Sequence, residues 1–134
     1  MSEREYDIGT AELEVLSALW ELGPSTVRAV LNHLHERGRR VAYTTVLTYM
    51  TRLEAKGFVR TDKREQAYVY RAAVTQSKVR RSRLRQLLDQ LYDGASAPLA
   101  LQLIRQGRFT REEIDELRQL IDRLDVKRGG SQPD

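Results

Sequence analysis

Three threonines at helical spacing are the residues in this sequence best suited to specific chemistry. Thr44, Thr48 and Thr51 fall on one face of a predicted helix over residues 43–56, opposite its apolar stripe. Solvent-facing helix surfaces usually carry Glu, Lys, Gln or Arg, because β-branched Thr loses rotamer freedom in a helix. A Thr hydroxyl can exchange hydrogen bonds with base edges, and its methyl group can contact the C5-methyl of thymine. This face therefore favours direct readout of DNA bases over simple exposure to solvent. The predicted base-reading residues are Thr44, Thr45, Leu47, Thr48, Thr51 and Arg52.

Long basic side chains surround this face. Arg52, on its flank, could form a bidentate pair with a guanine or grip a phosphate. The other cations are suited to neutralising phosphates, which positions a protein on DNA without reading its sequence. The predicted phosphate contacts are Arg28, Arg39, Arg40, Lys56, Lys63, Arg64 and Arg71. A further basic cluster, Arg80, Arg81, Arg83 and Arg85, is interpreted as a solvated helix face in preference to a DNA contact.

The distribution of charge favours a polyanionic partner and argues against catalysis. The formal net charge is +4, and residues 23–72 alone carry ten bases and four acids. A localised basic region is the electrostatic footprint of a nucleic-acid-binding protein. The chain has no Cys, and its only imidazoles, His33 and His35, diverge on a helix. We therefore predict no catalytic residue, no metal site and no cofactor. No apolar run approaches the roughly 20 residues of a membrane span, and we expect a cytoplasmic, non-enzymatic protein.

The first part of the chain has the element order of a winged helix-turn-helix. Amphipathic helices are expected over residues 10–22, 26–37 and 43–56. Thr10 and Ser25 are the expected N-caps of the first two helices. Two short alternating runs, 58–61 and 68–71, flank a polar stretch and predict a β-hairpin. We predict a mainly α fold with a small β-hairpin, in which residues 8–73 form a winged-helix DNA-binding domain.

The second part of the chain is helical and rich in leucine. Helices are expected over residues 75–92, 97–106 and 110–124, the last opened by a Thr110–Glu113 capping box. So short a segment buries too little surface to fold alone, so pairing with a second copy is favoured over folding back on the first part. We divide this part into a helical dimerisation domain, 74–125, and a disordered tail, 126–134. The predicted homodimer contacts are Leu88, Leu91, Leu99, Leu101, Leu103, Ile104, Ile114, Leu117, Leu120, Ile121 and Leu124.

Several segments together resemble the BlaI/MecI penicillinase repressor family, whose relatives include copper-responsive regulators. The matching segments are Ala-Glu-Leu-Glu-Val-Leu at 11–16, Ala-Tyr-Thr-Thr-Val-Leu-Thr at 42–48, Arg-Leu-Glu-Ala-Lys-Gly at 52–57, Ala-Tyr-Val-Tyr at 67–70 and Glu-Glu-Ile-Asp-Glu-Leu at 112–117. The resemblance implies a dimeric repressor that binds inverted repeats in the promoters it silences, with the 43–56 helix as its recognition helix. The copper-responsive relatives carry a cysteine pair that this chain lacks, which excludes copper sensing by that route.

The resemblance also implies a candidate cleavage position. In the β-lactam-responsive repressors, induction cuts the chain inside the dimerisation region at an Asn-Phe bond. Aligning the motifs on either side of that bond places Gln102 and Leu103 at this position. A protease pocket shaped for Asn-Phe would discriminate against the longer amide and the aliphatic Leu. A regulatory protease of altered specificity and a non-proteolytic signal are both open as ways to end repression, and we favour the second.

We therefore predict a homodimeric repressor that occupies palindromic, double-stranded operator DNA and performs no chemistry. One alternative is a winged-helix protein-interaction module that docks a partner through its C-terminal helices. The basic excess over residues 23–72 and the threonine-rich face argue against that alternative. An RNA-binding role is less favoured, because the stacking aromatics that such surfaces use are not evident on that face.

Overall fold

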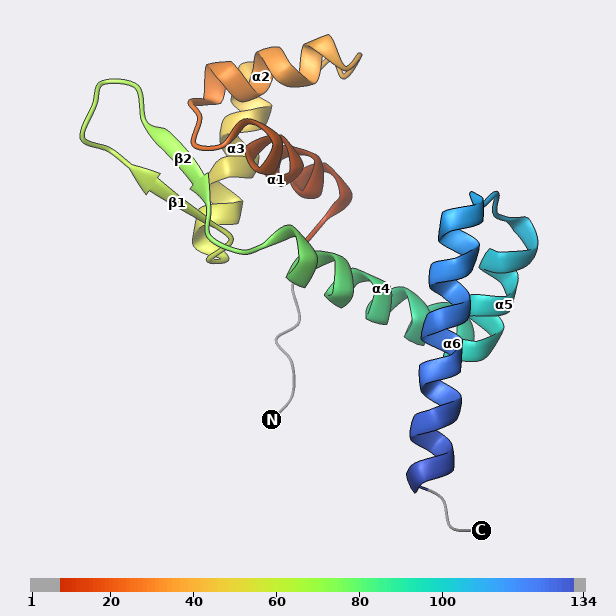
Figure 1. Cartoon of the computed structure of the whole chain (residues 1–134). Helices are drawn as coiled ribbons and strands as arrows, with labels where there is room; N and C mark the ends of the chain where they lie inside the picture. Colours follow the sequence, from red (N-terminus) through yellow and green to blue (C-terminus); the bar gives the residue numbers. More distant parts are fainter. Residues whose placement is uncertain (1–7, 132–134) are drawn as a thin grey trace. The chain divides into compact units, whose positions relative to one another are not determined.

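The described part of the chain folds into six helices and one two-stranded antiparallel sheet (Figure 1). The computed structural model describes residues 8–131, with side chains up to residue 127. In chain order the elements are α1 (Thr10–Leu22), α2 (Val27–Glu36), α3 (Tyr43–Ala55), β1 (Val59–Asp62), β2 (Val69–Ala72), α4 (Gln76–Tyr92), α5 (Ser96–Gln106) and α6 (Arg111–Ser131). The predicted fold class, a mainly α winged helix-turn-helix with further C-terminal helices, is confirmed.

Helices α1, α2 and α3 pack around one apolar core. On α3 the buried residues are Val46, Met50 and Leu53, the stripe that the helical periodicity predicts. Because side chains at these spacings share one face of a helix, their burial turns Thr44 and Thr48 towards solvent. The most deeply buried large side chains of this core are Leu16, Leu19, Met50, Leu53, Val15, Val30, Val46 and Val79.

The chain leaves α3 through a glycine turn that leads directly into the hairpin. Gly57 has a φ of 84°, a left-handed conformation that favours glycine at the end of a helix. The Phe58 amide then donates to the Leu53 carbonyl at 2.9 Å, and the Phe58 side chain is buried in the core. Phe58 therefore closes α3, and the strands begin one residue later than the predicted positions 58 and 68.

The hairpin is joined to the helical core by a third stretch of backbone. Within the hairpin, Thr61 pairs with Tyr70 in an antiparallel register. Tyr70 also exchanges two backbone hydrogen bonds with Ser25, at 2.8 and 2.9 Å. Ser25 lies in the turn before α2, so this bridge fixes the hairpin beside the N-terminal end of α2.

Two predicted N-caps are wrong by one residue. The N-cap of α1 is Gly9, and Thr10 is the first helical residue. The Gly9 amide donates a hydrogen bond to Glu12 Oε1 at 3.0 Å. The N-cap of α2 is Thr26, whose hydroxyl accepts from the Ala29 amide at 3.1 Å. Ser25 cannot cap α2, because its backbone is engaged in the bridge to Tyr70.

The chain divides into two compact units, one ending at Leu87 and the other beginning at Leu88. This division falls within α4, later than the boundary after residue 73 that the sequence suggested. The reason is that the first half of α4 packs on the core, where Val79 and Ser82 are buried. Two hydrogen bonds hold this part of the chain to the core. Trp20 Nε1 donates to the Val74 carbonyl, just before α4, at 3.0 Å, and Arg83 Nη1 donates to the Ile8 carbonyl at 2.8 Å.

The second unit contains the end of α4 together with α5 and α6. The predicted capping box is present at the start of α6, where Thr110 and Glu113 exchange two hydrogen bonds at 2.9 and 3.1 Å. Helix α6 continues to Ser131, whereas the sequence suggested a disordered tail from residue 126. A helix that is already nucleated gains one backbone hydrogen bond per added residue, which can outweigh the poor helix propensity of Gly129 and Gly130. Residues 132–134 of that tail lie outside the described residues.

Among the helices that the structure describes, none combines the length and the apolar character needed to cross a membrane.

Candidate nucleic-acid interface

The outer face of α3 carries the predicted base-reading residues. Five of them are exposed together on this helix, and only Thr45 is partly buried. The exposed members are Thr44, Leu47, Thr48, Thr51 and Arg52. Arg52 lies in the last turn, with its guanidinium 5.8 Å from the centre of the Tyr49 ring. The helix therefore presents small hydroxylated side chains along its length and one long donor near its end.

Two of these threonines use their hydroxyl protons within the helix. Thr48 Oγ1 donates to the Thr44 carbonyl at 2.9 Å, and Thr51 Oγ1 donates to the Leu47 carbonyl at 3.0 Å. These bonds fix the side-chain rotamers and leave the hydroxyl lone pairs as acceptors. In this conformation the face offers acceptors and methyl groups, which suit the amino groups of adenine or cytosine and the methyl of thymine.

Three of the predicted phosphate contacts are already engaged in ion pairs. Arg39 Nε lies 2.8 Å from Glu14 Oε2, Lys56 Nζ lies 2.8 Å from Glu12 Oε1, and Arg64 Nη2 lies 2.7 Å from Asp62 Oδ2. The sequence suggested that these cations would be available to DNA. Their carboxylate partners come from elsewhere in the fold or from across a tight turn, so each of these cations already faces an acid.

The pair between Lys56 and Glu12 is the most enclosed of the three. Only 7% of the Glu12 side chain is exposed, against 36% of Lys56. Burial raises the pKa of Glu12, but the hydrogen bonds from Lys56 and from the Gly9 amide outweigh it, and the net pKa lies below the ordinary value. Glu12 therefore remains ionised and ties the first turn of α1 to the end of α3. The one sequence signal for this buried ion pair is the position of Glu12, an acid beside the apolar residues of α1.

The pair between Arg64 and Asp62 shapes the tip of the hairpin. Asp62 accepts from both the backbone amide and the guanidinium of Arg64, at 2.7 to 3.1 Å. The hydrogen bond from the Arg64 side chain is the main reason that the pKa of Asp62 falls to about 2. The carboxylate is thus charged at all ordinary pH values, and it holds the Arg64 guanidinium at the hairpin tip.

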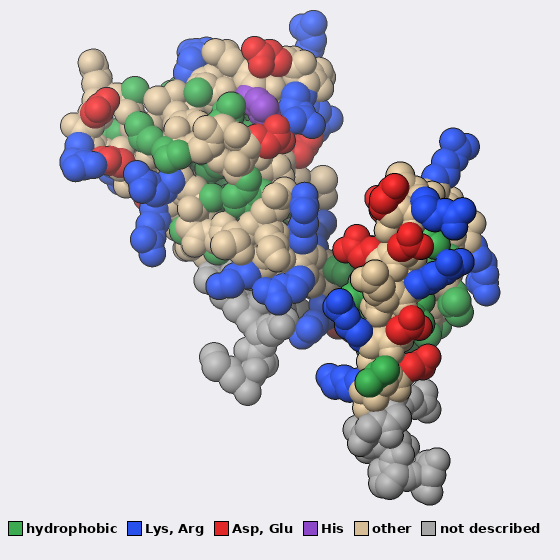
Figure 2. Space-filling model, viewed as in Figure 1, with side chains coloured by type: hydrophobic (Ala, Val, Ile, Leu, Met, Phe, Trp, Pro, Cys, Tyr) green, Lys and Arg blue, Asp and Glu red, His purple; other side chains and the backbone are tan. Residues whose placement is uncertain are grey.

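The remaining predicted phosphate contacts, Arg28, Arg40, Lys63 and Arg71, are exposed. Two of them lie against aromatic rings. The Arg28 guanidinium is 4.9 Å from the centre of the Tyr43 ring, and Lys63 Nζ is 5.8 Å from that of Tyr68. Figure 2 shows basic side chains around the hairpin, at the left of the view. The basic cluster on α4 is only partly solvated, because Arg83 is partly buried and bonded to the Ile8 carbonyl.

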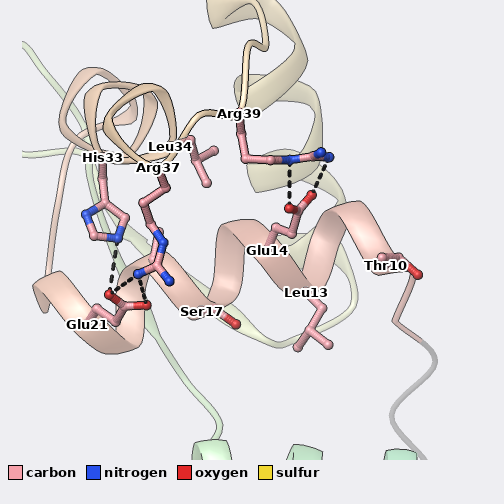
Figure 3. Close-up of a pocket in the computed structure, with 10 residues that line it drawn as sticks. Thr10, Leu13, Glu14, Ser17, Glu21, His33, Leu34, Arg37 and Arg39 are labelled. Atoms are coloured by element: carbon pink, nitrogen blue, oxygen red, sulfur yellow. Dashed lines mark hydrogen bonds and ion pairs between the residues drawn. The ribbon is translucent and has the colours of Figure 1, made fainter.

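Two open pockets on the first unit differ in their chemistry. The pocket between α1 and α2, about 370 Å³ in volume, is bordered by Glu14 and Glu21 (Figure 3). Both acids face basic partners, and Glu21 Oε2 lies 2.8 Å from Arg37 Nη1 and 3.3 Å from His33 Nε2. These contacts hold α2 and the segment after it against α1, so the charged residues around this pocket serve to stabilise the helix packing.

The other pocket, which we name the helix–wing crevice, opens between the starts of α2 and α3 and the hairpin. Its volume is about 340 Å³, and none of its lining residues carries a carboxylate. Its principal lining residues are Arg28, Tyr43, Leu47, Gln66, Tyr68 and Tyr70. Tyr43 and Tyr68 line this crevice but are not among the site residues predicted from the sequence. The available signal was their position, one beside the threonine face and the other at the polar tip of the hairpin.

A three-helix core that exposes a threonine and arginine face on its third helix, beside a basic hairpin, defines a winged-helix DNA-binding regulator. The chain belongs to the penicillinase repressor family, whose family model matches residues 8–123. It is a DNA-binding transcriptional repressor. The resemblance found in the sequence is thereby confirmed.

Individual relatives match nearly the whole chain. The transcriptional regulator BlaI of Mycobacterium tuberculosis is 31% identical, over 94% of this chain and 91% of its own. The methicillin resistance regulatory protein MecI of Mammaliicoccus sciuri is 24% identical, over 92% of this chain and 99% of its own. A solved structure of monomeric Bacillus licheniformis BlaI in complex with the blaP half-operator is 25% identical, with a TM-score of 0.48, over 57% of this chain and 93% of that one.

Proposed function

We propose that this chain represses transcription as a homodimer that occupies a palindromic operator in double-stranded DNA. Each protomer inserts α3 into a major groove, and its hairpin contacts the flanking backbone. The observation that carries the proposal is the α3 face, on which Thr44, Thr48, Thr51 and Arg52 are exposed together. Membership of a family of repressors supports the same reading. Repression follows from occupying the promoter, so no catalytic step is assigned, and the protein acts in the cytoplasm, on the DNA that it represses.

The proposed dimer contact is the apolar surface formed by the end of α4, α5 and α6. Helix α5 has no buried residue in the single chain, although most of its side chains are apolar. Leu103, Ile104, Leu120 and Ile121 are each about half exposed. An apolar surface of this kind is covered most simply by the same surface of a second copy, because a two-fold axis brings the same patch of both copies together. The full predicted set from Leu88 to Leu124 is proposed as that contact.

We favour a non-proteolytic signal for ending repression. Gln102 and Leu103 lie inside α5, where the peptide bond between them is part of a regular helix. A protease binds its substrate as an extended strand, so this bond requires local unfolding before cleavage. In addition, Gln102 and Leu103 stand where the β-lactam-responsive repressors have Asn-Phe, so a protease pocket shaped for Asn-Phe would bind this bond less well. A regulatory protease of altered specificity is the second candidate.

Selection of duplexes from a random library, followed by binding measurements on the enriched sequence, tests the proposal. We expect a palindrome with two half-sites. The full-length protein should bind it at least about 1,000-fold more tightly than a random duplex. Arg52→Ala should weaken binding to that operator by about 1–3 kcal/mol and relax the preference at one position per half-site.

The matched control is Arg81→Ala, which removes an exposed Arg from α4. It should leave the preference for each operator position unchanged. Enrichment of no common sequence, or equal affinity for the enriched and random duplexes, would refute the proposal.

A further inference from the structure

The helix–wing crevice lies where one strand of a bound duplex has to pass. The major and minor grooves of a duplex are separated by a single sugar-phosphate strand. If α3 occupies the major groove and the hairpin flanks it, that strand crosses the gap between these two elements. The crevice occupies this gap, with Leu47 of α3 on one side and Gln66 and Tyr68 of the hairpin on the other.

The side chains of the crevice suit a phosphodiester. Its one charged lining residue is Arg28, whose guanidinium is held 4.9 Å from the centre of the Tyr43 ring. Such a contact restrains the long side chain while leaving its donors free for an anion. The α1–α2 pocket of similar volume is bordered by two acids, each already opposite a basic partner, so the two pockets differ in that the crevice has no carboxylate in its lining.

The aromatic residues complete a surface for the sugar-phosphate strand. Tyr43 and Tyr68 line the crevice and are 41% and 46% exposed, so both residues are accessible to a ligand there. A phenol can donate to a phosphate oxygen, while its ring packs against the apolar side of a deoxyribose. Tyr70 is buried among the lining residues, and its burial raises the pKa of its hydroxyl, so it stays neutral.

We propose that the helix–wing crevice is a binding site for the sugar-phosphate strand that runs between α3 and the hairpin. Arg28 neutralises one phosphate there, and the Tyr43 and Tyr68 hydroxyls donate to its oxygens or to those of a neighbouring phosphate. The proposal rests on the proposed DNA-binding function and adds a subsite to it. Because these contacts touch no base edge, they strengthen binding to operator and to random duplex alike.

The test measures the affinity of the full-length protein for the selected operator and for a random duplex over a range of salt concentrations. Arg28→Gln should weaken both complexes about tenfold and reduce the slope of log K against log salt by about 0.9, the value for one phosphate. The double variant Tyr43→Phe/Tyr68→Phe should weaken both complexes about threefold with an unchanged slope, because it removes hydroxyls and no charge. Arg28→Lys should restore the slope.

A neutral methylphosphonate, placed at each operator phosphate in turn, identifies the phosphate concerned. Substitution at one position should weaken binding of the unmodified protein and should not weaken binding of Arg28→Gln any further. The controls are Arg81→Gln and Tyr92→Phe, which alter an Arg and a Tyr of α4 outside the crevice. Unmodified protein that binds no duplex would refute the proposed function itself. Normal binding with an unchanged slope in Arg28→Gln would overturn the crevice proposal alone.

Discussion

Replacing Lys56 by Met should destabilise the first unit and leave the salt dependence of DNA binding unchanged. The substitution removes the ammonium group and keeps a side chain of similar length. The Glu12 side chain is only 7% exposed. Without Lys56, its carboxylate keeps the hydrogen bond from the Gly9 amide but has lost its ion-pair partner. An unpaired charge in that environment is costly, because little water reaches it to replace the lost partner.

The expected loss lies between two known limits. Exposed ion pairs contribute up to about 1 kcal/mol, and removing one partner of a fully buried pair costs about 3–5 kcal/mol. Glu12 is nearly buried, but Lys56 is 36% exposed, so solvent screens part of the interaction. We therefore expect a loss of about 2 kcal/mol in the free energy of unfolding. For a unit of this size that corresponds to a fall of roughly 8–16 °C in Tm.

Urea unfolding of the full-length protein, followed by circular dichroism at pH 7, measures this loss. The double variant Glu12→Gln/Lys56→Met should be more stable than Lys56→Met alone, because it no longer buries an unpaired carboxylate. Lys78→Met, which alters an exposed Lys of α4, is the matched control and should change stability by less than about 0.5 kcal/mol. A similarly small change in Lys56→Met, or a double variant whose loss equals the sum of the two single losses, would refute the reasoning. A salt slope reduced by about 0.9 in Lys56→Met would show instead that Lys56 neutralises a phosphate.

Two further predictions concern acid and assembly. The pKa of Glu12 is lowered in the folded chain, so its contribution to stability is complete above the unfolded carboxyl pKa, about 4.5, and is lost as the pH falls through the folded value. Urea midpoints measured from pH 6 to pH 3 should therefore fall less steeply for Glu12→Gln than for the unmodified protein, and parallel curves would contradict this assignment. Ile121→Asp should sediment as a monomer at micromolar concentration and lose most of its operator affinity, because two half-site contacts are no longer coupled. Gln119→Asp, an exposed control on the same helix, should remain a dimer, whereas an unmodified protein that is itself monomeric would exclude the proposed interface.

Much of the fold follows from local patterns in the sequence. The spacing of Val46, Met50 and Leu53 predicts both the third helix and the face that it buries, and the opposite face then carries Thr44 and Thr48. The hairpin follows from two alternating runs around a polar tip, within one residue of the observed strands. These features depend on residues only a few positions apart, which is why they can be recognised without coordinates.

Which of the cations face a carboxylate was decided by tertiary structure. Sequence position made Arg39 and Lys56 equivalent to Arg28 as phosphate contacts, but folding brings Glu14 and Glu12, from a helix near the start of the chain, against the first two. The helix–wing crevice has the same origin, because its walls come from three separate segments joined by the pairing of Ser25 with Tyr70. Periodicity identifies the residues that face solvent on one element. Which charged groups then meet one another depends on how elements distant in the sequence pack, and no local pattern records that packing.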